Sequence, residues 1–344
     1  MRALRKIKPG AGADFVDIPT PVIGEHDLLI RVKAAAMCKS DVEVFEWSLL
    51  VASANYDLPF TMGHEFSGEV EAVGRLVKNF KPGDRVAGET HIPCGYCHEC
   101  RTDNQHICTN HMGVLGRNVD GCFAEYIRLP EISAIKLAND ADFVQMSLLE
   151  PMGTALHALQ KAGASGKNIA IMGVGTIGLM ACELAKMLGA ARVIAFAANE
   201  RRLAYSLKVG ADIAVNGLKE DFVKVAKEQT DGQGLDCILD LTGNSKVINQ
   251  AIDALATAGT LVHVGMVQGE LAIPDYMYRV VYRELKIKGL YGRHMFKTWD
   301  MLLRLVNNGK INLGNYVGEV MPITEYQKAL DCFKDLNGRA VMIP

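Results

Sequence analysis

The sequence predicts an α/β protein in two parts, a β-rich region first and a doubly wound parallel sheet after it. Up to about residue 140, short apolar and β-branched segments are separated by Gly, Pro and Asp, which is typical of strands joined by turns. From about Leu149 onward, strand-like runs alternate with helical stretches. This alternation is typical of βαβ units, in which helices cover both faces of a parallel sheet.

In the first part, four segments are expected to be strands. They are residues 27–32, 66–73, 84–87 and 123–129. The tripeptide Pro82-Gly83-Asp84 predicts a turn, because proline presets φ and glycine can adopt positive φ. Helix-period patterns are nearly absent before residue 140, so we expect an irregular β-rich domain.

In the second part, strand-like and helix-like stretches alternate. The expected strands are residues 168–172, 192–196, 213–215, 235–241, 261–264 and 285–289. The expected helices are residues 177–188, 200–208, 221–227 and 247–256. Two further helical stretches, 298–306 and 324–335, close the chain. This last segment is too short to fold alone, so we expect it to pack back on the first part.

Composition excludes several classes of function. The 344 residues are enough for two domains, each with its own core. Lys and Arg number 37 against 39 Asp and Glu, and the formal charge of −2 gives no general attraction to nucleic acid or an anionic membrane. No apolar run approaches the ~18–20 residues of a membrane span, and residues 1–6 lead into no signal-peptide core. We therefore expect a cytoplasmic protein with neither kind of partner.

Four of the nine cysteines, Cys94, Cys97, Cys100 and Cys108, have the spacing C-x2-C-x2-C-x7-C. Such crowding in a chain without an export signal indicates a metal site in a reducing compartment. Four thiolates at this spacing can complete a closed tetrahedral shell around a structural zinc. A ferredoxin run begins in the same way but continues x3-C-P, unlike this chain. We expect a structural zinc, with an iron–sulfur cluster or labile thiols as the alternatives.

The motif Gly173-Val-Gly175-Thr-Ile-Gly178 follows the expected strand 168–172 and opens the expected helix 177–188. G-x-G-x-x-G is weak alone, but between a strand and a helix it indicates dinucleotide binding. The glycines provide the turn, the close approach of the backbone to pyrophosphate and the packing of helix on strand. The diphosphate is expected at the helix N-terminus around Thr176 and Ile177, where free N–H groups favour anions.

The acidic residue that would bind the ribose of NAD is missing. The second strand of this domain is expected to end near Ala197, where dinucleotide-binding domains that take NAD carry an acidic residue, and Asn199, Arg201 and Arg202 follow. Without a carboxylate for the 2′-hydroxyl, and with guanidinium groups available for a 2′-phosphate, we expect NADP to be preferred. The alternative is that both arginines cover a helix surface and NAD binds with less help.

Two further candidate metal ligands, Cys38 and His64, are weak signals when taken singly. His64 could be a hydrogen-bonded core histidine and Cys38 a small buried hydrophobe. Their order in the chain, however, resembles that of the zinc-dependent medium-chain alcohol dehydrogenases. Cys38, His64-Glu65, the four-cysteine loop, residues 121–126 and the dinucleotide motif follow the family's order over essentially the whole chain. Residues 46–47, 90–94 and 288–299 are most similar to the threonine 3-dehydrogenase and sorbitol-type polyol dehydrogenase branches.

The resemblance implies a GroES-like catalytic domain, formed by residues 1–152 and 296–344, and a Rossmann dinucleotide-binding domain formed by residues 153–295. It also implies a catalytic zinc held by Cys38 and His64, with Glu65 and Glu150 in or beside the ligand shell. One thiolate, one imidazole and a carboxylate leave one coordination position for water or for the substrate oxygen.

The same resemblance implies roles for further residues. Ser40 matches the hydroxyl that contacts the substrate oxygen and starts a proton relay, with a simple turn residue as the alternative. His91 matches a histidine near the active site of threonine dehydrogenases, and we expect it to bind substrate or release the proton; the alternative is a loop histidine. By family position, the backbone of Val264, Gly265 and Met266 borders the nicotinamide, together with Tyr291.

Two departures from the family pattern bear on the substrate. Where relatives carry His or another relay residue three positions after the hydroxyl, this chain has Glu43. Its carboxylate can accept a proton, or bind a cationic group of the substrate or ribose hydroxyls; the alternative is a solvated surface acid. Residues 48–59 match threonine dehydrogenases poorly. We expect zinc- and NAD(P)-dependent oxidation of a secondary alcohol (a threonine-like 3-hydroxy amino acid, an amino alcohol or a polyol) by a homodimer or homotetramer. The alternatives are a zinc-free quinone or enone reductase of the same fold and a non-catalytic nucleotide-binding protein.

Overall fold

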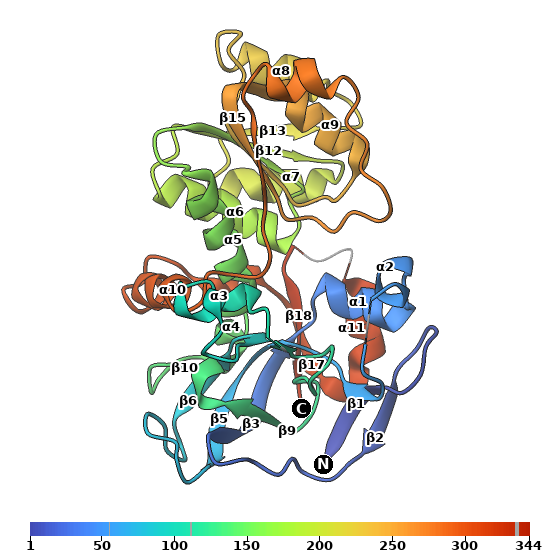
Figure 1. Ribbon diagram of the computed structural model, residues 1–344, viewed down its shortest axis with the longest axis vertical. Coiled ribbons are helices and arrows are strands. Elements are labelled where there is room, and N and C mark those ends of the chain that lie inside the picture. Colours follow the sequence, from blue (N-terminus) through green and yellow to red (C-terminus); the bar gives the residue numbers. More distant parts are fainter. Residues whose placement is uncertain (55, 111, 334–336) are drawn as a thin grey trace. The chain divides into compact units, whose positions relative to one another are not determined.

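The computed structural model describes residues 1–54, 56–110, 112–333 and 337–344, which form two compact units (Figure 1). Unit 1 contains Met1–Gly153 and His294–Pro344, and unit 2 contains Thr154–Arg293. The division falls within helix α5 (Leu149–Ala162). None of the described helices is long and apolar enough to cross a membrane.

Unit 1 is built on β-sheets that are mainly antiparallel. The largest has the order β10 (Ala134–Lys136), β6 (Arg85–Gly88), β5 (Glu65–Val73), β3 (Asp27–Ala36), β18 (Arg339–Ile343) and β17 (Val317–Pro322), and β9 (Tyr126–Pro130) also pairs with β3. Two smaller sheets join β2 (Asp14–Asp17), β1 (Arg2–Lys6) and β4 (Phe60–Thr61), and β7 (His91–Ile92) with β8 (Gly113–Val114). Because β18 pairs with β3, the C-terminal segment completes the sheet of the N-terminal region.

Alternation within the strands places the core of unit 1. Ile30 and Val32 of β3 are buried, whereas Arg31 between them is exposed, as a strand with one covered face requires. Phe66 and Val70 of β5 join the same core from the neighbouring strand. Burial of these apolar side chains is the main term that stabilises the unit.

The helices between residues 39 and 162 were missed by the sequence prediction. Helix α1 (Lys39–Glu46) begins with a capping box, in which the Cys38 side chain accepts from the backbone and Asp41 accepts from the Cys38 N–H. Helix α5 is buried on almost every face, and it contains Pro151 and Gly153, which lower helix propensity. The short helices α2 (Leu49–Ala52), α3 (His98–Arg101) and α4 (Phe143–Met146) have a single turn each.

Unit 2 has one six-stranded sheet in which every pairing is parallel. Its order is β13 (Ile213–Asn216), β12 (Arg192–Ala197), β11 (Asn168–Met172), β14 (Leu235–Asp240), β15 (Leu255–His263) and β16 (Lys286–Gly289). Counted from β11, this is the order 3-2-1-4-5-6 of the Rossmann fold, so the predicted doubly wound sheet is confirmed. The connecting helices are α6 (Thr176–Met187), α7 (Glu200–Val209), α8 (Phe222–Glu228) and α9 (Ser245–Ala254).

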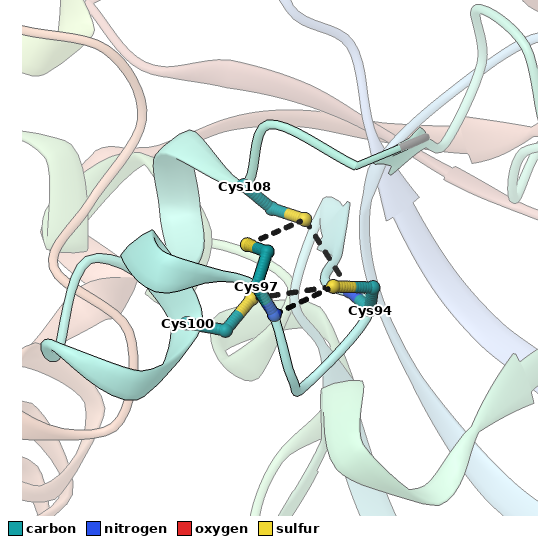
Figure 2. A group of neighbouring side chains, drawn as sticks. All are labelled: Cys94, Cys97, Cys100 and Cys108. Atoms are coloured by element: carbon teal, nitrogen blue, oxygen red, sulfur yellow. Dashed lines mark hydrogen bonds between the residues drawn. The ribbon is translucent and has the colours of Figure 1, made fainter.

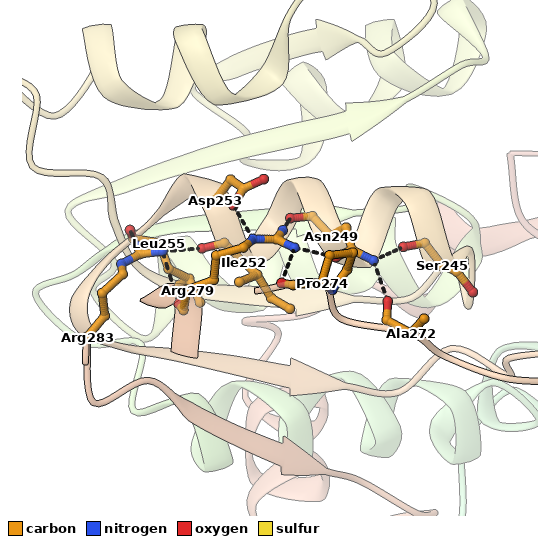
Figure 3. Close-up of polar contacts among 9 residues, drawn as sticks. All are labelled: Ser245, Asn249, Ile252, Asp253, Leu255, Ala272, Pro274, Arg279 and Arg283. Atoms are coloured by element: carbon orange, nitrogen blue, oxygen red, sulfur yellow. Dashed lines mark hydrogen bonds and ion pairs between the residues drawn. The ribbon is translucent and has the colours of Figure 1, made fainter. Parts of the chain in front are cut away.

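Between β15 and β16 the chain forms a π-helical turn, Met277–Val281, that the sequence did not predict. Figure 3 shows how arginines attach this segment to α9. Arg279 donates to Asp253 Oδ1 and to Asn249 Oδ1, both at 2.8 Å, and Arg283 donates to the carbonyl of Ile252 at 2.9 Å. The last carbonyls of α9 are thereby satisfied by cationic side chains, as expected at a helix C-terminus.

The C-terminal segment contains α10 (Lys297–Asn307) and α11 (Tyr326–Cys332), the latter preceded by a 3-10 turn, Ile323–Glu325. The first agrees with the expected helix 298–306. The second starts two residues later than the expected helix 324–335, whose positions 334 and 335 lie outside the described residues.

Candidate metal and dinucleotide sites

The four clustered cysteines lie together in unit 1, on the loop that carries α3 and the 3-10 turn Gln105–Ile107 (Figure 2). Their sulfur atoms are all within 4.8 Å of one another, with 3.7 Å between Cys97 and Cys108 and 3.9 Å between Cys94 and Cys100. Four sulfurs at 2.3 Å from one tetrahedral zinc would be separated by about 3.8 Å. The spacing therefore fits zinc, and it is too long for disulfide bonds.

Backbone N–H groups are aimed at these sulfurs. A hydrogen bond from the N–H of Cys100 lowers the pKa of the Cys97 thiol to about 5, whereas burial raises the pKa of Cys100 to about 12. Backbone donors thus favour a thiolate at Cys97, whereas Cys100 stays a protonated thiol unless a cation lies beside it. A divalent ion bound by all four would remove this conflict, because metal-bound thiols are deprotonated.

A second group of possible ligands, Cys38, His64 and Glu65, also has its side-chain atoms within 4.8 Å of one another. Cys38 caps α1, while His64 and Glu65 stand where β5 begins. Gly63, just before them, has φ of +89°, and a Cβ there would lie 2.3 Å from the ring of Phe123. Only glycine fits at position 63, where the chain turns tightly against Phe123 just before His64.

Asp41 organises this second group. It is buried on α1, and its Oδ2 accepts the Cys38 N–H at 2.8 Å while its Oδ1 lies 3.4 Å from His64 Nδ1. Burial by itself lowers the pKa of His64, but the Asp41 carboxylate outweighs it and the pKa is raised well above its ordinary value. A carboxylate on one imidazole nitrogen orients the ring and leaves the other nitrogen for a metal.

Besides Asp41, the sequence analysis missed Arg339 at this site. It binds both oxygens of Glu65, at 2.7 and 3.0 Å, and its Nη2 lies 3.6 Å from Cys38 Sγ. Burial raises the pKa of Glu65 in spite of this partner. Arg339 is the first residue of the apolar strand β18 and lies 274 residues after Glu65 in the chain. In the sequence it is recognisable only as a charged residue that precedes a run of apolar residues.

The remaining predicted residues of unit 1 lie on α1, β7 and α5. Glu150 is buried in the first turn of α5 and accepts a hydrogen bond from Thr90 Oγ1 at 2.6 Å. The three-residue group found among the described residues does not include it. Ser40 and Glu43 lie half-buried on α1, and His91 is buried on β7.

The dinucleotide motif of unit 2 joins β11 to α6. Gly173 has φ of +100°, and Gly175 caps the helix with an extended backbone. A Cβ on Gly178 would lie 2.1 Å from the Gly173 carbonyl, so no side chain fits there. The loop is as tight as pyrophosphate binding at a helix N-terminus requires, and Thr176 and Ile177 are the first residues of that helix.

At the end of β12, Ala197 is followed by Asn199, which caps α7 by accepting the Arg202 N–H at 3.0 Å. Arg201 is exposed in the first turn of the helix. A Cβ built on Gly175 would lie 4.0 Å from Arg202 Nη1, so this guanidinium reaches the glycine loop. The residue at the end of β12 is therefore an alanine, and Arg202 lies near the glycine loop.

Val264, Gly265 and Met266 follow β15, where a Cβ on Gly265 would lie 2.2 Å from Gly243 N. The loops after β14 and β15 are thus in contact, and Tyr291 lies half-exposed after β16. Asp240, which the sequence analysis missed, is fully buried at the end of β14. It accepts from the backbone and hydroxyl of Thr242, at 3.0 and 2.6 Å. The loops that follow parallel strands at a topological switch point form dinucleotide sites.

Comparisons with known proteins agree with this geometry. Residues 24–139 match the alcohol dehydrogenase GroES-like domain, and residues 176–308 match the family described as zinc-binding dehydrogenase. The chain is 38% identical to L-threonine 3-dehydrogenase of Caldanaerobacter subterraneus subsp. tengcongensis and 36% identical to that of Bacillus subtilis, over 100% of this chain and 99% of each relative. The solved alcohol dehydrogenase of Aeropyrum pernix is 30% identical, with a TM-score of 0.90 and full coverage of both chains.

Proposed function

Because the chain belongs to the zinc-dependent medium-chain alcohol dehydrogenase family, we propose that it oxidises a secondary alcohol bearing a neighbouring amine or hydroxyl to the ketone. The predicted family and enzyme class are confirmed: the chain is a zinc- and NAD(P)-dependent dehydrogenase acting on a hydroxyl group. The proposal is based on the convergence of the Cys38, His64 and Glu65 side chains. Asp41 contacts the His64 ring, and Arg339 contacts Cys38.

We assign two zinc ions to unit 1. Cys38, His64, Glu65 and Glu150 would hold a catalytic ion, and the four cysteines of Figure 2 a structural one. A zinc ion bound at the first site supplies a Lewis acid that lowers the pKa of the substrate hydroxyl. In this assignment Ser40, Glu43 and His91 accept and pass on the proton of the substrate hydroxyl. Asp41 keeps His64 oriented, and Arg339 offsets the negative charge of Glu65 and Cys38.

We infer NADP as the preferred cofactor. Gly173, Gly175 and Gly178 would receive the pyrophosphate, and residues 264–266 with Tyr291 would border the nicotinamide. The chain has Ala197 where a ribose-binding acid would stand, and Arg202 reaches the glycine loop. Arg201 and Arg202 can pair with a 2′-phosphate, which NAD lacks.

For the substrate we propose a threonine-like 3-hydroxy amino acid, an amino alcohol or a polyol. Relatives named L-threonine 3-dehydrogenase support the first of these. Glu43 would supply an acceptor for a cationic or hydroxyl group beside the reacting carbon. The proposed catalytic domain comprises residues 1–152 and 296–344, and the proposed nucleotide domain residues 153–295. We further propose that the protein works in the cytoplasm.

Initial rates with threonine, 2,3-butanediol, sorbitol and related amino alcohols, each with NADP and with NAD, test the proposal. We expect turnover with at least one vicinal alcohol, a kcat/KM for NADP above that for NAD, and two zinc ions per chain by elemental analysis. Arg202→Ala should reduce the ratio of kcat/KM for NADP to kcat/KM for NAD, and kcat at saturating NADP should not change. A higher kcat/KM with NAD than with NADP would contradict the cofactor assignment. Reduction of quinones or enones by a zinc-free protein would support the alternative function.

A further inference from the structure

Glu89 is a fully buried carboxylate outside both metal groups and between β6 and β7. Its Oε1 accepts the backbone N–H of His91 at 3.0 Å and lies 2.7 Å from Nδ1 of the same residue. Its Oε2 accepts the indole N–H of Trp299 at 2.7 Å. Trp299 is buried on α10, 210 residues along the chain, so two distant segments share one acid.

These contacts decide where the protons lie. The backbone and the indole can only donate, so each carboxylate oxygen must accept a hydrogen bond. An imidazole is a stronger base than a carboxylate, so the proton between Nδ1 and Oε1 belongs to the imidazole. The ionised Glu89 therefore holds His91 with its proton on Nδ1, and Nε2 is the nitrogen that can take part in chemistry.

We propose that Glu89, together with Trp299, is a positioning residue that fixes His91 as the Nδ1-protonated tautomer, with Nε2 as an acceptor. The inference rests on the proposed function for its chemical consequence. With the proton on Nδ1 and Nε2 as acceptor, His91 receives a hydrogen bond or a proton at Nε2 and has none to give there. It therefore favours substrates that carry an ammonium or hydroxyl donor beside the reacting hydroxyl, and it disfavours those with a carbonyl or ether at that position.

Ring nitrogen NMR of the full zinc-loaded chain, labelled with [15N]histidine, tests the tautomer directly. His91→Gln assigns the signals. We expect His91 of the wild type to carry its proton on Nδ1, with Nε2 bare. In Glu89→Met, which offers no acceptor, this state is lost and kcat/KM for the alcohol falls about 10- to 100-fold, as for other losses of an orienting carboxylate. A bare Nδ1 in the wild type, or an unchanged His91 spectrum in Glu89→Met, overturns the proposal.

Two further variants separate positioning from general structural damage. Glu89→Gln keeps one acceptor oxygen, which serves the two donors of His91, so the Nδ1-protonated state returns while the indole N–H signal of Trp299 shifts. Ser133→Ala removes a hydroxyl that donates to the His91 carbonyl at 3.1 Å, and it should leave the ring signals unchanged. Loss of the Nδ1-protonated state in Glu89→Gln counts against the proposal. If the spectra change as expected but kcat/KM does not, the tautomer assignment stands and the reaction role of His91 is overturned.

Discussion

At the scale of single residues, buried charges and their partners explain most of the site. Glu65 and Arg339 are both buried, and each would be costly in the interior without the other. Asp84, in the turn that the sequence predicted at residues 82–84, is likewise buried and paired with Lys81 and Lys136. The first pair serves the metal group, whereas the second stabilises the fold.

Breaking the buried pair should be far more damaging than breaking an exposed one. Arg339→Met leaves Glu65 without its cation, so we expect a loss of about 3–5 kcal/mol in the free energy of unfolding. Zinc affinity at the Cys38 site should weaken about 10- to 100-fold. Arg31→Met, which breaks the exposed pair with Glu71, should change the free energy of unfolding little. Urea unfolding of both variants and zinc titration check this; similar losses in the two variants would contradict it.

Asp84 gives a pH-dependent contribution to stability. Burial by itself raises its pKa, but hydrogen bonds from Lys136 and Lys81 bring the pKa down to about 2. The folded-state pKa is below the unfolded value of about 3.9, so the stabilisation is complete above pH ~4 and is lost as the pH falls toward 2. Asp84→Asn should lower the free energy of unfolding by about 1–2 kcal/mol at pH 7, with allowance for the exposed lysines.

Urea unfolding of Asp84→Asn and wild type at several pH values between 7 and 2 provides the check. The difference between the two proteins should shrink as the pH approaches 2. Asp17→Asn, at an exposed position of β2, serves as the control and should show a small difference at every pH. A difference for Asp84→Asn that stays constant down to pH 2 would refute the assignment.

At the scale of elements, short segments with strong local chemistry were predictable and buried helices were not. The cysteine spacing and the glycine motif each depend on residues that are close in sequence, so the loop of Figure 2 and the turn before α6 were anticipated. Helix α5 was missed because Pro151 and Gly153, two residues of low helix propensity, stand in its first turns. Helix α1 was missed because its N-cap residue is Cys38, and cysteine is not among the residues that mark a helix N-terminus in a sequence.

The cysteine loop should behave as one zinc-dependent element. Cys100→Ser removes one of four ligands, so we expect the zinc content to fall from two ions to one per chain and the loop to become sensitive to proteases. Binding of NADPH to unit 2 should persist. Cys122→Ala, at a buried cysteine outside the cluster, should keep both ions. Elemental analysis and limited proteolysis check this, and iron in the purified protein would point to a cluster instead.

At the scale of the whole molecule, chemistry is divided between the two units. Unit 1 contains both groups of possible metal ligands, and unit 2 contains the glycine loop and the loops after β14 and β15. Unit 2 also has an edge strand, β16, whose side chains are mostly exposed, and it has exposed tyrosines at Tyr278 and Tyr282. An exposed edge strand is suited to pairing with a second copy of the chain.

We therefore expect the homo-oligomer to form through unit 2. Light scattering of the wild type should give a multiple of the chain mass of 37.5 kDa. Ile287→Lys, which adds a charge to the exposed side of β16, should shift the protein toward monomers. Leu218→Lys, at an exposed apolar residue just after the opposite edge strand β13, should leave the mass unchanged. A monomeric wild type would exclude the proposed assembly.

The amino-acid sequence by itself determined the features that depend on neighbouring residues. These are the strand and helix alternation of unit 2, the glycine turn before α6, and the crowding of four cysteines on one loop. Only the tertiary structure decided the features that join distant segments: Arg339 beside Cys38 and Glu65, and Trp299 on the same carboxylate as His91. The physical reason is that a buried charge needs a partner close to it in space. Which residue is that partner depends on the segments that the fold brings together, and their separation in the sequence does not reveal it.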